Sequence, residues 1–250
     1  MDSISMVCFP HAGAGRFYYS RWQQAFSGIV DLNIVQYPLR ENRLNTPMPE
    51  SVGELAEDIF EEFEDVLRGP YAIWGHSMGG VLGYEVAKLC QERLGNAPLT
   101  FFSSGSSAPC RARFRRVGNL DTPEGFRDVL LRYGGVPEEY LRDADFMTYF
   151  APAIKADLRL LSAYQDTGRV PLRCPLVLML GRGDTVTPDQ WEHYTDHSLE
   201  VNEYEGGHFF LDRHRESMVA LMESRLQLAW QLREARTAVG APARPGGEVL

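Results

Sequence analysis

Short apolar segments alternate along this chain with longer segments in which apolar positions recur at helical spacing. Strands are predicted where β-branched and aromatic residues cluster, at 4–9, 32–37, 71–74, 99–104, 176–180 and 199–204. Helices are predicted at 52–67, where acidic residues fill the outer face and Ser51 with Glu54 forms a capping box, and at 79–94 and 212–231. Alternating strands and helices are typical of the α/β class, here a doubly wound and mostly parallel sheet.

One interval interrupts this alternation. Residues 110–168 contain two to four helical segments separated by glycine and proline, between the fourth and fifth predicted strands. Because ligands bind beyond the carboxyl ends of the strands in such sheets, we interpret this insertion as a helical lid. Helices that only pad the fold are the alternative. Residues 235–250 are small and rich in proline and glycine, so we expect one domain over 1–234 and a disordered tail.

Composition narrows the function classes. With 250 residues, 44% of them hydrophobic, the chain can bury a sizeable core. The net charge of −9 argues against partners with phosphate backbones and against anionic membranes. Cys8, Cys90, Cys110 and Cys174 form no CxxC pair, which predicts reduced thiols and no metal site. Neither a signal peptide nor an apolar run of membrane-spanning length is present, so we expect a cytoplasmic protein.

The segment GHSMG follows the third predicted strand and begins a helix. Gly75 and Gly79 permit the tight turn that would lift Ser77 above the sheet edge as a nucleophile. The helix start supplies free N–H groups, of which that of Met78 is the first expected donor to an oxyanion. A phosphate-binding loop is excluded, since no lysine follows before Lys88. A purely structural glycine turn is the remaining alternative.

A serine nucleophile needs a base and a carboxylate that orients it. In α/β-hydrolases the acid follows a late strand and the histidine follows the next one, which indicates Asp184 and His208. Asp189 lies further into the same loop and is the weaker alternative for the acid. The other histidines fit the base less well and are interpreted as solvated or structural: His11, His76, His193, His197 and His214. The expected triad is therefore Ser77, Asp184 and His208.

The second oxyanion donor is expected in the loop after the first strand. This loop, FPHAGAG at 9–15, is rich in glycine, which lets backbone N–H groups approach a carbonyl oxygen. We assign the donor to the N–H of Ala12. The N–H of Gly13, or a loop that is only a turn, are the alternatives.

These motifs together resemble one family. FPHAGAG, YPLRENR at 37–43, WGHSMGG at 74–80, the helical insertion with GGVPEEYL and ADLRLLSAY, GRGD at 181–184 and GGHFFL at 206–211 are similar to type II thioesterases. These stand-alone enzymes accompany polyketide synthases and nonribosomal peptide synthetases. The resemblance implies an α/β-hydrolase fold with a mobile lid and hydrolysis of acyl thioesters on the phosphopantetheine arm of carrier proteins. It assigns the same triad, Ser77, Asp184 and His208, and the same oxyanion donors, Met78 and Ala12.

The chain departs from the family pattern near the expected pocket. Ala14 and Leu39 stand where the members usually carry glycine, which bears on the acyl group accepted. Arg40, Glu41 and Arg43 lie in a loop at a strand end. A buried ion pair that orders the loop and contact with a ligand are equally open, so their role is unassigned.

The resemblance also sets expectations about partners. Acyl or peptidyl carrier domains of the synthases are expected to bind, with no cofactor, metal, nucleic acid or membrane, and the enzyme is expected to be a monomer. The basic segment RARFRR at 111–116 could steer an acidic carrier or be a solvated face. Editing of stalled acyl groups is the expected activity. A dedicated product-releasing thioesterase or acyltransferase and a non-enzymatic binding module are the alternatives.

Overall fold

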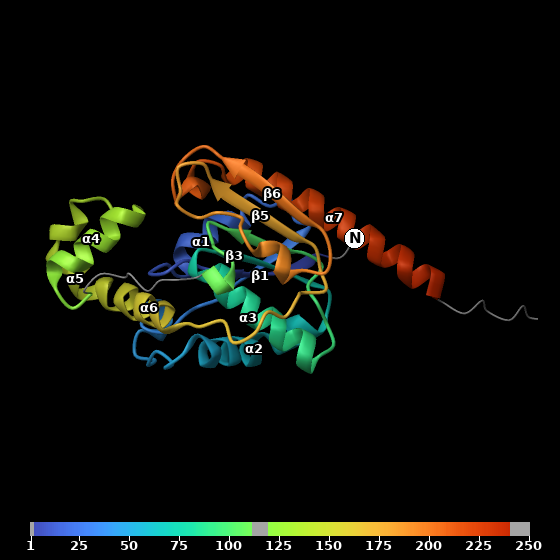
Figure 1. Cartoon of the computed structure of the whole chain (residues 1–250), viewed down its shortest axis with the longest axis horizontal. Coiled ribbons are helices and arrows are strands. Elements are labelled where there is room, and N and C mark those ends of the chain that lie inside the picture. The colour runs from blue at the N-terminus through green and yellow to red at the C-terminus, as the bar shows by residue number, and fades with distance from the viewer. Residues whose placement is uncertain (1–2, 112–119, 241–250) are drawn as a thin grey trace, which may run out of the picture.

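The computed structural model describes residues 3–111 and 120–240 of the chain. Its centre is a six-stranded parallel sheet in the order β2-β1-β3-β4-β5-β6 (Figure 1). The strands are β1 (Ile4–Phe9), β2 (Val30–Ile34), β3 (Tyr71–His76), β4 (Phe101–Ser104), β5 (Leu176–Gly181) and β6 (Leu199–Tyr204). The predicted doubly wound parallel sheet is confirmed.

Helices cover both faces of this sheet. On one face lie α2 (Val52–Arg68) and α3 (Met78–Arg93), and on the other α1 (Arg16–Gln23) and α7 (Arg215–Gly240). Strand β1 shows the division, because Val7 packs into the first apolar cluster and Met6 and Cys8 pack into the second. A strand that is buried on both faces needs a continuous apolar segment, and MVCF at 6–9 supplies one.

Some predicted boundaries are wrong. Strand β2 begins at Val30 and ends at Ile34, because at this sheet edge buried residues alternate with more exposed ones and the chain then turns into a buried loop. Helix α7 runs to Gly240, six residues beyond the predicted domain end, since LREARTAV consists largely of good helix formers. The rest of the predicted tail, 241–250, lies outside the described residues. Helix α1 has no counterpart in the prediction.

The cap of α2 is confirmed in part. The Ser51 hydroxyl accepts the N–H of Glu54, as a capping box requires. The Glu54 carboxylate reaches back to the N–H of Glu50 instead of that of Ser51.

The insertion between β4 and β5 is helical. It contains α4 (Pro123–Tyr133), α5 (Ala144–Tyr149) and α6 (Ala151–Ala163), which form a lobe beside the sheet with an apolar cluster of its own (Figure 1). Short 3-10 helices complete the described elements at Glu41–Arg43, Pro109–Arg111, Tyr140–Arg142, Trp191–Tyr194 and Phe210–Asp212. Among the helices of 3–111 and 120–240, none has the length and apolar character needed to cross a membrane.

Candidate active site

The turn between β3 and α3 places Ser77 at the carboxyl edge of the sheet. Ser77 has φ +54° and ψ −115°, a backbone conformation that side-chain-bearing residues rarely adopt. The glycines of GHSMG are sterically required: a Cβ at Gly79 would lie 1.9 Å from the carbonyl oxygen of Phe9, and one at Gly75 would lie 2.1 Å from that of Gly79. The close packing of α3 on β1 thus forces the strained turn that carries the serine.

Two further loops bring the acid and the base to Ser77. Nδ1 of His208 lies 2.7 Å from Oδ2 of Asp184, and its Nε2 lies 2.9 Å from Oγ of Ser77. A carboxylate can only accept, so Nδ1–H donates to Asp184 and leaves Nε2 free to accept from the Ser77 hydroxyl. Both His208 and Asp184 are buried, with side chains 7% and 5% exposed. The three residues thus have the geometry of a Ser-His-Asp triad.

The approach of the two loops depends on small residues. Asp184 follows β5 and His208 follows β6, and a Cβ at Gly181 would lie 2.4 Å from the carbonyl oxygen of Gly207. Asp189, the alternative acid, is not brought to the histidine; it is exposed and accepts a hydrogen bond from the Thr187 hydroxyl.

The two expected oxyanion donors come from different elements. Met78 is the first residue of α3, so its N–H lacks an intrahelical acceptor. Ala12 lies in the loop after β1 and lines the same cavity as Ser77 and His208. The N–H of Gly13, the alternative donor, already donates to Oδ2 of Asp157 at 2.7 Å. This favours Ala12 over Gly13.

Two other histidines pack beside the triad. The ring of His76 lies 5.2 Å from that of His208 and 5.6 Å from that of His11. Loss of hydration, followed by the proximity of His208, lowers the pKa of His11 to about 3 and that of His76 well below its usual range. Both are therefore neutral at physiological pH, and they surround His208 without adding charge.

The remaining histidines stand apart from the site. His193 and His197 pair with neighbouring acidic side chains at the surface, and His214 donates to the carbonyl oxygen of Glu205. Their positions agree with the solvated or structural role predicted for them.

A cavity of about 620 Å³ opens above the triad, between the sheet edge and the lid. Its lining is mostly apolar and comes from α4, α5, α6 and the turn after α4, from α1 and the loops after β1 and β2, and from the segment that follows β6. The lid residues are Val129, Leu130, Tyr133, Gly134, Gly135, Val136, Phe146, Tyr149, Phe150, Ala153, Ile154, Leu158 and Leu161. Four aromatic residues of the lid, Tyr133, Phe146, Tyr149 and Phe150, line the cavity, whereas Phe126 is buried within the lobe.

The charged loop after β2 is ordered by contacts within the protein. Arg40 forms a buried ion pair with Asp157 of α6, which is one of the two roles left open for it. The Glu41 carboxylate accepts the N–H of Phe17 at the start of α1, and Arg43 donates to the carbonyl oxygen of Gln36.

The two departures from the family pattern have different structural consequences. Leu39 has φ +64°, a left-handed conformation that favours glycine, so leucine is strained there. Ala14 has no positive φ; it is buried and lines the cavity.

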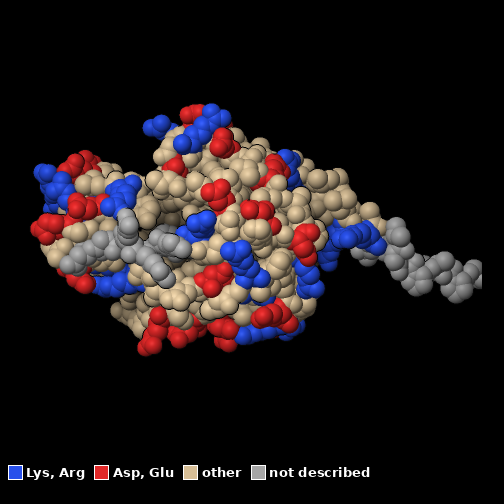
Figure 2. All heavy atoms as spheres, in the orientation of Figure 1, with Lys and Arg blue, Asp and Glu red and all other residues tan. Residues whose placement is uncertain are grey.

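Other predicted features carry less information. The described cysteines are free, and within 3–111 and 120–240 no cluster of three or more His, Cys, Asp or Glu side chains suits a metal ion. Of the basic segment, Arg111 ends a 3-10 helix and is exposed, whereas 112–116 lie outside the described residues. Basic and acidic side chains are interspersed over the face seen in Figure 2, and acidic groups gather along its lower edge, where α2 lies.

The parallel sheet, the strained serine turn and the buried histidine and aspartate after β6 and β5 define an α/β-hydrolase. A family profile described as "Thioesterase domain" matches residues 5–226. The chain therefore belongs to the thioesterase family, whose members hydrolyse thioesters.

Named relatives agree with this assignment. Thioesterase PikA5 of Streptomyces venezuelae is 32% identical over 84% of this chain and 76% of its own length. The crystal structure of ClbQ from the colibactin NRPS/PKS pathway superposes with a TM-score of 0.82 at 27% identity, covering 92% of this chain and 99% of ClbQ. The type II thioesterase BorB from the borrelidin biosynthetic cluster gives a TM-score of 0.78 at 27% identity, covering 90% and 93%.

Proposed function

We propose that this thioesterase hydrolyses acyl groups from the phosphopantetheine arm of carrier proteins in polyketide or nonribosomal peptide biosynthesis, and so removes aberrant or stalled acyl groups. The triad geometry at Ser77 carries the proposal. The relatives drawn from such pathways and the apolar cavity beside the serine support it. The lid side of the cavity suits an uncharged acyl chain, because its uncharged, mostly apolar side chains provide no partner for a buried charge.

The mechanism follows from the hydrogen bonds. Nε2 of His208 takes the proton of Ser77 as Oγ attacks the thioester carbonyl, and Asp184 holds the imidazole in the required tautomer. The N–H groups of Met78 and Ala12 stabilise the oxyanion. The imidazolium then protonates the departing pantetheine sulfur. Water, deprotonated by the same histidine, hydrolyses the acyl-serine and regenerates the enzyme.

The neutral histidines beside His208 favour its protonation during catalysis. Because burial keeps His11 and His76 uncharged, no second imidazolium opposes the charge that His208 acquires in each transition state. The strained Ser77 backbone presents Oγ at the cavity, away from competing partners in the turn.

Replacement of the nucleophile tests the proposal. Ser77→Ala should abolish acetate release from an acetylated carrier protein, with only residual activity remaining. Ser162→Ala is the matched control, because this hydroxyl is exposed on α6 and donates to the carbonyl oxygen of Arg159. Normal turnover by Ser77→Ala would refute the assignment.

Two further measurements address the alternatives. An active-site phosphonate followed by mass spectrometry should label Ser77, whereas a non-enzymatic binding module would remain unlabelled. A panel of acyl carrier proteins should yield free acids from several short acyl groups. A single preferred acyl group, or transfer to an acceptor other than water, would instead indicate a dedicated releasing enzyme or acyltransferase.

A further inference from the structure

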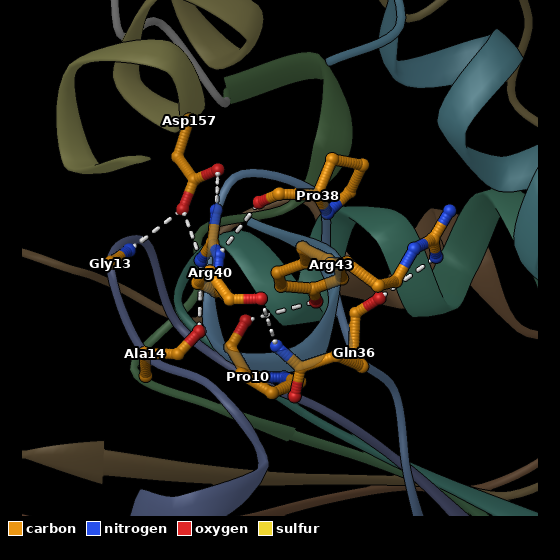
Figure 3. A network of polar contacts seen from close by, with 9 residues as sticks. Pro10, Gly13, Ala14, Gln36, Pro38, Arg40, Arg43 and Asp157 are labelled. Atoms are coloured by element: carbon orange, nitrogen blue, oxygen red, sulfur yellow. Dashed lines mark hydrogen bonds and ion pairs between the residues drawn. The ribbon is translucent and has the colours of Figure 1, made fainter. Parts of the chain in front are cut away.

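A buried ion pair links the lid to the loops below it. Nη2 of Arg40, in the loop after β2, lies 2.6 Å from Oδ1 of Asp157 in α6, and Nη1 lies 2.8 Å from Oδ2 (Figure 3). The two side chains are 7% and 0% exposed. This is a bidentate, charge-assisted contact, the geometry in which such pairs are strongest.

The same pair holds the loop that carries the expected oxyanion donor. Oδ2 of Asp157 accepts the N–H of Gly13 at 2.7 Å, and Nη1 of Arg40 donates to the carbonyl oxygen of Ala14 at 2.8 Å (Figure 3). Gly13 has φ +83°, and a Cβ there would lie 2.5 Å from Cγ1 of Ile154 in α6. The backbone on the carboxyl side of Ala12 is therefore shaped directly by the lid helix.

Arg40 makes further contacts with the same two loops. Its Nε donates to the carbonyl oxygen of Pro38, and its guanidinium lies over the Tyr37 ring at 5.3 Å. The Tyr37 hydroxyl in turn donates to the carbonyl oxygen of Pro10, at the start of the same loop. The loop after β1 is thus fixed at Pro10, Gly13 and Ala14.

Stability alone does not account for this arrangement. Burial raises the pKa of the Asp157 carboxyl, and the Arg40 guanidinium and the Gly13 N–H oppose that rise. An apolar pair of similar volume is often as stable as a buried ion pair, because it avoids the desolvation of two charges. What an apolar pair cannot do is orient the two peptide groups that the ion pair binds.

We propose that Asp157 is a positioning residue: from the lid it orients the Ala12–Ala14 backbone so that the Ala12 N–H faces the oxyanion formed at Ser77. The inference rests on the proposed acyl transfer by Ser77. Because the contact comes from α6, the oxyanion site is complete only when this lid helix is seated on the loop.

The competing explanation is that the ion pair is purely structural. Two double variants distinguish this explanation from the positioning role. Arg40→Met/Asp157→Leu removes both charges and the acceptor for the Gly13 N–H. Arg40→Met/Asp157→Asn removes the same charges but keeps an amide oxygen for that N–H. Arg159→Gln is the matched control, since it removes an exposed lid ion pair on the same helix.

The readouts are the kcat and KM for an acyl N-acetylcysteamine thioester and the affinities for two acyl analogues. A trifluoromethyl ketone forms a tetrahedral adduct with Ser77 and requires the oxyanion site, whereas a non-hydrolysable amide reports binding in the cavity. The leucine double variant should lose about 10²-fold in kcat and in ketone affinity at unchanged amide affinity. The asparagine double variant should retain most of the kcat and most of the ketone affinity, and Arg159→Gln should match the wild type in both.

Stability and activity are to be compared in the same variants, each assayed well below its unfolding temperature. Equal losses of kcat in the two double variants, or a leucine double variant with wild-type kcat, would overturn the inference. If the leucine double variant does not fold, Arg40→Met/Asp157→Met replaces it in the comparison with the asparagine double variant, because its flexible side chain also lacks an amide oxygen and leaves no unpaired buried charge. A wild-type enzyme that neither cleaves the thioester nor binds the ketone would instead overturn the proposed function itself.

Discussion

Replacing Asp184 by asparagine should remove most of the catalytic activity while leaving the fold intact. Asp184 accepts the Nδ1–H of His208 at 2.7 Å, whereas an amide NH2 in that place would favour the tautomer with its proton on Nε2. A proton on Nε2 prevents His208 from accepting the proton of Ser77, 2.9 Å away. A change of this kind costs about 10⁴-fold in kcat, or about 5 kcal/mol of transition-state stabilisation.

The matched control is Asp189→Asn. It removes the same charge from the same loop, but this carboxylate is exposed and bonded only to the Thr187 hydroxyl among the described contacts. The assay is steady-state hydrolysis of an acyl N-acetylcysteamine thioester, with thermal unfolding measured in parallel. The Asp189 variant should retain wild-type kcat. A loss of less than tenfold in the Asp184 variant, or similar losses in both, would refute the assignment of the acid.

Three further substitutions test the fold and the cavity. Gly79→Ala places a Cβ 1.9 Å from a β1 carbonyl oxygen and should lower the unfolding free energy by at least about 3 kcal/mol in urea titrations, whereas Gly168→Ala, in open space, should be neutral. Burial lowers the pKa of His76 in the folded protein. Below pH 6.5 the unfolded state therefore binds a proton at His76 that the folded state does not bind, so the stability that the protein has above pH 6.5 is lost as the pH falls. His76→Gln should therefore reduce the stability difference between pH 7.5 and pH 5.0 by about 2 kcal/mol, and the exposed His193→Gln should not. Val129→Phe should fill the cavity and lower kcat/KM for octanoyl thioesters by about tenfold more than for acetyl thioesters; equal effects would show that this wall does not contact the chain.

The positions of the triad residues could be predicted because each one follows a strand. Ser77, Asp184 and His208 come directly after or shortly beyond β3, β5 and β6. Parallel strands end at one edge of the sheet, so a pattern that identifies the strands also predicts that these loops meet. The glycines near the triad residues supported the same prediction. Two backbones that approach each other closely leave no room for a Cβ, so glycine marks such a contact.

The lid was predictable as helices but not as a cavity wall. Helical spacing shows which residues share a face, and in α4 to α6 one apolar face packs within the lobe while another lines the cavity. Both faces are apolar, so the pattern cannot distinguish Phe126, which packs inside, from Tyr133 or Phe150, which face the site. The exact end of α7 was missed for a related reason, because favourable helix formers continue beyond the packed segment.

The two halves of the site depend on different parts of the structure. The nucleophile is held by the packing of α3 on β1, a contact of the sheet core, so substitutions there affect stability and activity together. The oxyanion loop is held by an ion pair between residues 117 positions apart, a contact that local sequence patterns do not reveal. The proposed role of Asp157 predicts that substitutions in α6 lower kcat without disturbing the triad. It also predicts that selection of the acyl group and the rate of its release are coupled through one helix, which lines the cavity with Ile154 and Leu158 and binds the loop through Asp157.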